Sequence, residues 1–396
     1  MNKIKQFFSF ILCFFLGTSC DQEKISDPVV TNLSSYREVF NPFHHFLGKN
    51  ESAITALDKP MVDEYAGTFE LRSMMDVTDS KKTSTDRITF NVIEGYDNPN
   101  NAWFREKLDT PALQALPENN GAVFQVASNF DCLEGGGGDH SQIMDYLSPG
   151  MYVQGEACAI SALPGTIARK YFLPKVNLLQ DFNKKWDIGY SSGYVQNILK
   201  INEWFGLMKD QEIYDAAQFV KVGVQKNTYV TGGFGPTRSE LQAAYQSGKY
   251  KAVKVDFKKG DQKVTQVFTA ALNPYYNNPT TKGFKNLAKI FLYAAYRGTL
   301  QAAGHVESQK VYLTLIGGGV FENKLEWIAE AIEYELNNVL FKSAQKPVEV
   351  NLVIYYSNGY KDRTDYKKAE DIFLKLVKQT GGLWTRYKDD GAYSLK

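Results

Sequence analysis

Short apolar runs alternate with longer helical segments in the second part of the chain. The apolar runs have the length of buried strands and lie at residues 122–127, 219–224, 229–231, 264–272, 311–316 and 348–355. Residues 283–303 and 324–336 carry apolar side chains at the spacing of one helical face, and residues 365–379 form a further predicted helix. This alternation predicts an α/β protein in which helices cover both faces of a mixed or parallel sheet.

The first part of the chain is organised differently. Strand-like runs at residues 68–74 and 87–93 are separated by a polar loop, and they predict an N-terminal subregion over residues 35–120. A polar tether precedes it at residues 21–34. The main domain then takes residues 121–396, with a large insertion at about 173–263.

The chain begins with an export signal. Lys3 and Lys5 precede an apolar stretch, residues 7–16, that is too short to span a bilayer comfortably. Small residues stand directly before Cys20, which resembles the lipobox of bacterial lipoproteins, although the usual Leu comes one place early as Leu16. We therefore expect a signal peptide over residues 1–20 and a lipid on Cys20, anchoring the exported protein to a membrane on its periplasmic or cell-surface side. An ordinary cleaved signal peptide is the alternative, and it also directs the chain out of the cytoplasm.

The composition of the chain bears on three questions: whether it binds nucleic acid, whether it forms disulfides and whether it binds a metal. The balance of 45 basic against 44 acidic residues gives no reason to expect nucleic acid as a partner. After the leader, Cys132 and Cys158 remain, and they form either one bridge or two buried thiols. With His140 they are too few and too loosely spaced for a zinc site, and His44-His45 has no further ligand nearby. The sequence predicts no metal and no cofactor.

Two glycine-rich loops follow predicted strands. The first consists of Gly135, Gly136, Gly137 and Gly138, and the second of Gly317, Gly318 and Gly319. Glycine lets backbone N–H groups approach a ligand, and the first loop leads through residues 152–172 into a predicted helix, the arrangement that holds an anion. Ligands bind such sheets at the carboxyl ends of strands. If the two strands are near neighbours, the two loops grip a diphosphate from both sides.

These loops carry a family resemblance. ASNFDCLEGGGG, residues 127–138, resembles the first phosphate loop of macrodomains, and GGGVFEN, residues 317–323, is similar to their second loop. The resemblance covers residues 121–356 and implies a three-layer α/β/α macrodomain-like mixed sheet. Macrodomains bind ADP-ribose, and some remove it from proteins or from poly-ADP-ribose. The implied partner is therefore an ADP-ribose-like small molecule or an ADP-ribosylated protein.

The resemblance also implies roles for individual residues. It assigns Asn129 to the neighbourhood of the distal ribose, both glycine loops to the diphosphate, and Phe321 to a stack near the distal ribose. Gln154 and Asn323 complete the implied ligand-binding set.

The acidic residues depart from the related pattern. The poly-ADP-ribose glycohydrolase branch has Gln-Glu-Glu after its glycines, whereas Gln142 here is followed by Ile143 and Met144. Gln154-Gly155-Glu156 is the nearest acidic replacement, Glu134 flanks the first loop, and Glu322 stands where the second loop normally has glycine. If the protein hydrolyses ADP-ribosyl bonds, Glu134 or Glu156 acts as the general acid or base.

Other function classes compete with this interpretation. Residues 189–193 match the G-x-S-x-G pattern of serine hydrolases around Ser191, but the preceding segment is polar and the only downstream histidine is His305. No Gly-Lys-Ser/Thr follows the glycines, which excludes a Walker A loop. The main alternative is a surface lipoprotein that binds glycans or proteins without catalysis, consistent with export and an aromatic content of 14%. The favoured function is binding of ADP-ribose or a related nucleotide diphosphate, with ADP-ribosyl hydrolase activity left open.

Overall fold

The computed structural model describes most of the chain after its N-terminal segment. The described residues are 59–73, 88–95, 108–134, 154–191, 194–195, 197–230, 262–273, 280–319, 321–338, 347–354, 363–388 and 391–395. All of them belong to one of two compact units of the chain, Tyr36–Lys396. The predicted leader with Cys20, the first glycine loop and His140 lie outside the described residues. No helix in the described ranges is long and apolar enough to cross a membrane.

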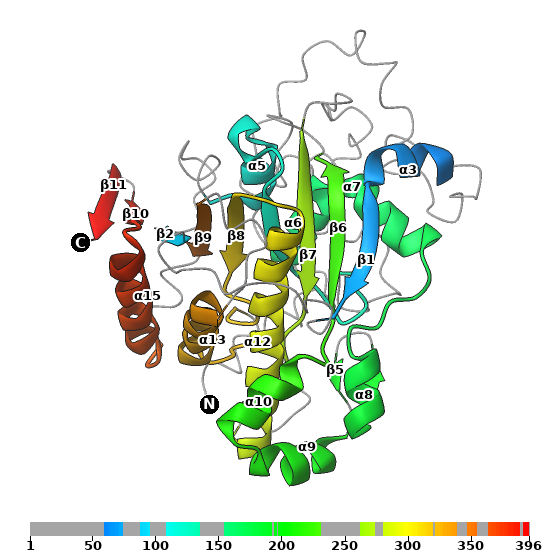
Figure 1. Cartoon of the computed structure of the whole chain (residues 1–396), viewed down its shortest axis with the longest axis vertical. Helices are drawn as coiled ribbons and strands as arrows, with labels where there is room; N and C mark the ends of the chain where they lie inside the picture. Colours follow the sequence, from blue (N-terminus) through cyan, green and yellow to red (C-terminus); the bar gives the residue numbers. More distant parts are fainter. Residues whose placement is uncertain are drawn as a thin grey trace, which may run out of the picture. The chain divides into compact units, whose positions relative to one another are not determined.

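The described strands form a nine-stranded mixed sheet in the order β1-β6-β7-β3-β8-β9-β2-β10-β11 (Figure 1). Its strands are β1 (Thr68–Arg72), β2 (Ile88–Glu94), β3 (Val123–Ala127), β6 (Val222–Tyr229), β7 (Lys263–Thr269), β8 (Lys310–Thr314), β9 (Val348–Ile354), β10 (Trp384–Lys388) and β11 (Gly391–Leu395). From β7 through β3, β8, β9 and β2 to β10 all neighbours run parallel. The strands towards each edge are antiparallel.

Helices cover both faces of this sheet. One layer holds α12 (Lys282–His305), α13 (Leu325–Asn338) and α15 (Tyr366–Thr380), and the other holds α3 (Lys59–Ala66), α5 (Thr110–Ala115), α6 (Gln154–Ser161) and α7 (Leu163–Ile167). Successive side chains of a strand point to opposite faces of the sheet, so neighbouring residues of β3 contact different helix layers. Gln125 donates to the carbonyl of Ala295 in α12, whereas Phe124 packs in a cluster with Leu113 of α5. The predicted three-layer α/β/α mixed sheet is confirmed.

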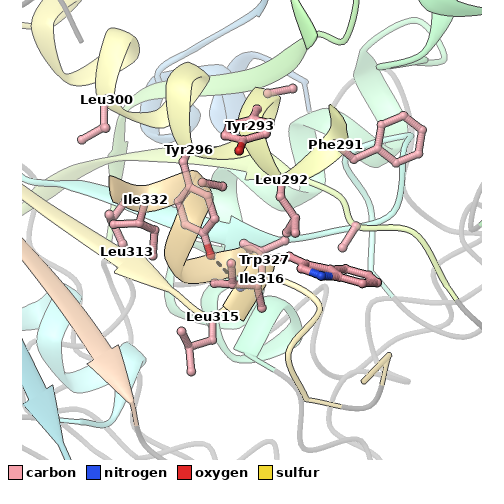
Figure 2. Close-up of a cluster of buried hydrophobic side chains, with 14 of the residues drawn as sticks. Phe291, Leu292, Tyr293, Tyr296, Leu300, Leu313, Leu315, Ile316, Trp327 and Ile332 are labelled. Atoms are coloured by element: carbon pink, nitrogen blue, oxygen red, sulfur yellow. Dashed lines mark hydrogen bonds between the residues drawn. The ribbon is translucent and has the colours of Figure 1, made fainter. Parts of the chain in front are cut away.

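The side of the sheet that carries α12 holds the larger apolar core. α12 begins after Thr281, whose hydroxyl accepts the amide of Phe284, and most of its side chains are buried. Figure 2 shows Tyr296 reaching from this helix to the end of β8. Its hydroxyl donates to the carbonyl of Thr314 at 2.8 Å and accepts the amide of Ile316 at 3.2 Å. The core therefore fixes the point at which the second glycine loop leaves the sheet.

Strands of the predicted N-terminal subregion and of the predicted insertion join the main sheet. From the subregion over residues 35–120, β1 pairs with β6, and β2 lies between β9 and β10. The expected insertion at 173–263 contributes β6 to the same sheet, as one strand where two short ones were predicted. It also contains α8 (Gln180–Trp186), α9 (Ile198–Trp204) and α10 (Asp210–Ala217). Strand pairing joins residues far apart in the chain, so an apolar run does not reveal its partner.

Candidate functional site

The two glycine loops follow neighbouring strands. β3 and β8 are parallel partners, with Val123 opposite Val311 and Phe124 opposite Tyr312. The residues after β3 and the second loop after β8 therefore leave the sheet at the same edge, which is where ligands bind open α/β sheets. Gly135–Gly138 themselves lie outside the described residues, but their strand has the neighbour that a two-loop site requires.

β3 and β8 separate near this edge, and two glutamine side chains take over the lost backbone pairing. Gln154 accepts the amide of Ala127 at 2.8 Å and donates to the carbonyl of Gln125 at 2.7 Å. The Gln125 side chain accepts the amide of Thr314 at 3.1 Å. The N-terminus of α6 thus enters the opening, which we call the β3–β8 split. Gln154, predicted to bind ligand, joins α6 to β3 through these two hydrogen bonds.

A tight turn after β3 returns the chain to this split. The amide of Asn129 donates to the carbonyl of Leu133 at 3.0 Å, and Cys132 has a left-handed backbone with φ of 62°. The turn places the carboxyl group of Glu134 against Gly155 at the start of α6. A β-carbon at residue 155 would lie 1.9 Å from the carbonyl oxygen of Ala127 and 2.3 Å from Oε1 of Glu134. Only glycine fits at this position.

The structure brings together the two glutamates predicted as acid or base. Glu134 and Glu156 are buried, with 8% and 1% of their surfaces exposed. Burial raises the pKa of Glu134 well above its ordinary value, and the negative charges of Glu156 and Asp131 raise it further against the opposing charge of Arg169. A carboxyl group with a raised pKa keeps its proton near neutral pH and acts as a general acid.

Arg169 was not predicted as part of the site. It is buried on the π-helical turn η9 (Ala168–Phe172), where its guanidinium lies 3.7 Å from the ring centre of Phe268. It donates to the carbonyl of Cys132 at 3.2 Å and to the side chain of Gln225 at 3.2 Å. These contacts fix a positive charge under the turn that carries Glu134. The available sequence signal was a basic residue in a stretch that is otherwise mostly small and apolar.

The second glycine loop is held mainly by its own backbone. Gly317 has a left-handed φ of 69°, and its carbonyl accepts the amide of Asn323 at 3.0 Å. Gly318 donates to the carbonyl of Leu315 at 2.9 Å, and a β-carbon there would face Leu325 and Ile328 of α13. A side chain at Gly318 would therefore disturb the core before it reached a ligand. Gly319 is exposed.

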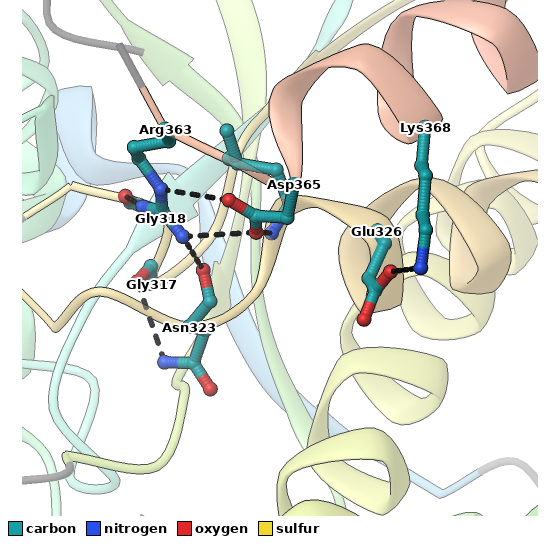
Figure 3. A network of polar contacts seen from close by, with 8 residues as sticks. Gly317, Gly318, Asn323, Glu326, Arg363, Asp365 and Lys368 are labelled. Atoms are coloured by element: carbon teal, nitrogen blue, oxygen red, sulfur yellow. Dashed lines mark hydrogen bonds and ion pairs between the residues drawn. The ribbon is translucent and has the colours of Figure 1, made fainter.

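Two other predicted contacts of this loop face the protein. The Asn323 amide group donates to the carbonyls of Leu272 and Gly317 at 3.0 and 3.3 Å, so its described contacts are internal. Phe321 is half-buried and packs against the core. Arg363 and Asp365, which the sequence did not single out, support the loop from the segment just before α15 (Figure 3).

The competing sites lack their required geometry. Ser191 lies in β4 (Tyr190–Ser191), which pairs with β5 (Tyr194–Val195) in a small separate ribbon, and α8 rather than a buried strand precedes it. His305 instead lies beside Lys226 at 2.9 Å. Cys132 and Cys158 are two buried free thiols. No group of three His, Cys, Asp or Glu side chains suited to a metal ion occurs among the described residues.

One surface hollow lies away from the predicted site residues. It encloses about 310 Å³ and is lined by Ser73, Asp181, Lys184, Lys185, Gln218 and Phe219. None of the predicted site residues lines it. A much smaller cavity of about 20 Å³ lies at the β3–β8 split, between Gln125, Gln154 and Thr314 among others.

No protein-family model matches the chain, and no curated protein matches it by sequence. Solved structures with a similar fold include poly(ADP-ribose) glycohydrolase from Thermomonospora curvata, at 11% identity and a TM-score of 0.41, over 80% of this chain and 88% of that one. The same enzyme from Deinococcus radiodurans, in complex with ADP-ribose, is 13% identical with a TM-score of 0.44, over 81% of this chain and 98% of that one. Likeness at these values does not assign a function.

Proposed function

We propose that the protein binds ADP-ribose or a related nucleotide diphosphate at the β3–β8 split and hydrolyses an ADP-ribosyl bond there. One observation supports the proposal: Glu134, in the turn after β3, and Glu156, at the start of α6, form a buried carboxyl pair beside β3, whose parallel neighbour β8 leads into the second glycine loop. Backbone amides of loops can donate hydrogen bonds to phosphate oxygens. A pair of carboxyl groups can supply the acid and the base for cleavage of a glycosidic bond at the neighbouring sugar. The ligand contacts stay predictions, namely Asn129, Gly135–Gly138, Gln154, Gly317–Gly319, Phe321 and Asn323. The macrodomain-like character of the fold is part of the proposal.

The carboxyl pair supplies the proton transfers that such cleavage needs. Burial and the negative charges of Glu156 and Asp131 raise the pKa of Glu134, so Glu134 is the member of the pair that holds a proton. The protonated member donates to the oxygen that leaves the anomeric carbon of the distal ribose. The ionised member takes a proton from the water that adds to that carbon. The products are free ADP-ribose and the released hydroxyl group, with no net change in protons.

The proposal extends to where the protein works. The predicted leader and the lipobox-like residues before Cys20 support export of the chain as a lipid-anchored protein. Its substrate is then an ADP-ribosyl compound or another nucleotide diphosphate derivative on that side of the membrane.

Calorimetric titration of the purified full chain with ADP-ribose, ADP and ribose tests the binding. We expect ADP-ribose to bind, ADP to bind more weakly and ribose to give no heat, because the loops recognise the diphosphate. No heat with any of the three would instead favour the glycan- or protein-binding module. For catalysis, Glu156→Gln should lower release of ADP-ribose from poly-ADP-ribose by about a hundredfold or more while changing affinity little. Equal turnover by the variant would remove Glu156 from the mechanism.

A further inference from the structure

Arg363 holds the second glycine loop at two points. Its Nη1 donates to the carbonyl of Gly318 and its Nη2 to the carbonyl of Asn323, both at 2.7 Å (Figure 3). Asp365 accepts from Nε and Nη2 of the same guanidinium at 3.2 and 3.1 Å, and it also accepts the amide of Leu325 at the start of α13. The arginine and the aspartate thus tie the loop and both helices into one hydrogen-bonded unit.

Holding the Gly318 carbonyl also sets the direction of the next amide. No peptide bond in the described chain is cis, and in a trans peptide the carbonyl and the following N–H point in opposite directions. The N–H of Gly319 therefore points away from Arg363. Gly319 is exposed, and its amide donates to no described residue, whereas the amides of Gly318 and Asn323 are bound inside the loop.

The N-terminus of α13 does not have a free amide of this kind for a phosphate at Leu325. Asp365 already supplies an anion there by accepting the Leu325 amide. Burial disfavours the charged form of Asp365, but hydrogen bonds from Arg363 and from that amide outweigh it and hold the pKa of Asp365 below its ordinary value. The start of α13 is therefore already occupied by a carboxylate of the protein itself.

We infer that Arg363 is a positioning residue for phosphate recognition: it fixes the Gly318–Gly319 peptide so that the Gly319 amide faces the diphosphate. This inference rests on the proposed function. We assign Arg363 an action through the loop, because four of its five N–H groups donate to protein oxygens.

Three variants of the full chain test the inference, each checked by circular dichroism to be folded at the temperature of measurement. Arg363→Gln removes the two-point hold, Arg363→Lys retains a single cationic donor, and Lys368→Gln is the matched control. Lys368 also joins α15 to α13, through Glu326 at 2.9 Å, without touching the loop (Figure 3). Hydrogen exchange of the peptide containing Gly318 and Gly319 is measured for each variant, together with calorimetric affinity for ADP-ribose and for adenosine.

We expect Arg363→Gln to speed exchange in that peptide and to weaken ADP-ribose binding by about tenfold or more, with adenosine unchanged. Arg363→Lys should fall between it and the wild type, and Lys368→Gln should match the wild type. Unchanged exchange and affinity in folded Arg363→Gln would overturn the inference while leaving the proposed function intact. Equal weakening for adenosine would also overturn it, since a general structural role then suffices. If the wild type binds no ADP-ribose, the proposed function fails, and the exchange data still show whether Arg363 fixes the loop.

Discussion

A side chain at position 155 would occupy the same space as the carboxyl group of Glu134. Gly155 stands in the middle of Gln154-Gly155-Glu156, where the related pattern has a glutamate. The carboxyl group of Glu134 enters that volume from the turn after β3. The proximity of Glu134 to the first glycine loop hinted at this role, but only the fold shows which volume it fills.

Gly155→Ala should be strongly destabilising. Its β-carbon would lie 1.9 Å from the backbone oxygen of Ala127, so β3 and α6 must move apart. We expect a loss of about 3 kcal/mol in the free energy of unfolding, at the upper end of overpacking costs. Urea titration measures it. Gly206→Ala is the control, because its β-carbon would meet the nearest atom at 3.6 Å. Similar losses in both variants would contradict the proposed contact.

Glu134→Gln should change how stability depends on pH. The pKa of Glu134 is raised in the folded state, chiefly by burial, so above pH 4.5 the unfolded chain releases this proton while the folded chain retains it. The wild type therefore loses stability as pH rises from 5 towards the folded pKa, by up to about 1.4 kcal/mol per pH unit, and the variant escapes this loss. Denaturation from pH 5 to 8 should show the variant gaining on the wild type. A constant difference would mean that the pKa of Glu134 is not raised.

The long regular elements were predictable from sequence because their side chains contact the core periodically. Residues 283–303 and 348–355 correspond closely to α12 and β9. The short elements α3 and α5, the hairpin of β10 and β11, and all strand partners were not predicted. The spacing of apolar residues indicates which side chains are buried, but it does not indicate which element they pack against.

The contacts of polar side chains were harder to predict from the sequence than the elements. Gln154 and Asn323 were predicted to contact ligand, and both make their described hydrogen bonds to backbone groups of this protein or, for Gln154, also to Cys158. Arg363 lies about forty residues after the loop that it holds. A side-chain amide or guanidinium can serve a ligand or the fold equally well, and only the position of its partners decides.

The second glycine loop carries a strained residue that a substitution can relieve. Glu322 has a left-handed backbone with φ of 49°, at the position where the related loop has glycine. A non-glycine residue there costs about 1–2 kcal/mol, partly offset by the entropy that glycine loses on folding. Glu322→Gly should therefore raise the free energy of unfolding by up to about 1 kcal/mol, and Glu322→Ala should leave it nearly unchanged. Thermal denaturation compares them, and a gain with alanine would argue against backbone strain.

At the scale of the whole molecule, the anchor is expected to be separable from the fold. All described elements lie beyond residue 58, and the predicted lipid attachment precedes them at Cys20. Cys20→Ser should release the protein from the membrane fraction, because a single lipidated N-terminus supplies the attachment. Its circular dichroism spectrum and thermal midpoint should equal those of the wild type lacking lipid. Sedimentation of the variant with membranes after a salt wash would show that another part of the chain binds them.

The strand order also determines when the protein can fold. β2 comes from the first hundred residues, yet its two neighbours, β9 and β10, come from the last fifty. An early strand must therefore wait without its partners until nearly the entire chain is present. For a cytoplasmic protein this delay would be a hazard, because contacts between distant residues form slowly and leave edges exposed. If the predicted leader exports the chain, the same delay becomes an advantage, because a chain that crosses a membrane before folding needs its central sheet to stay open until the last strands have followed.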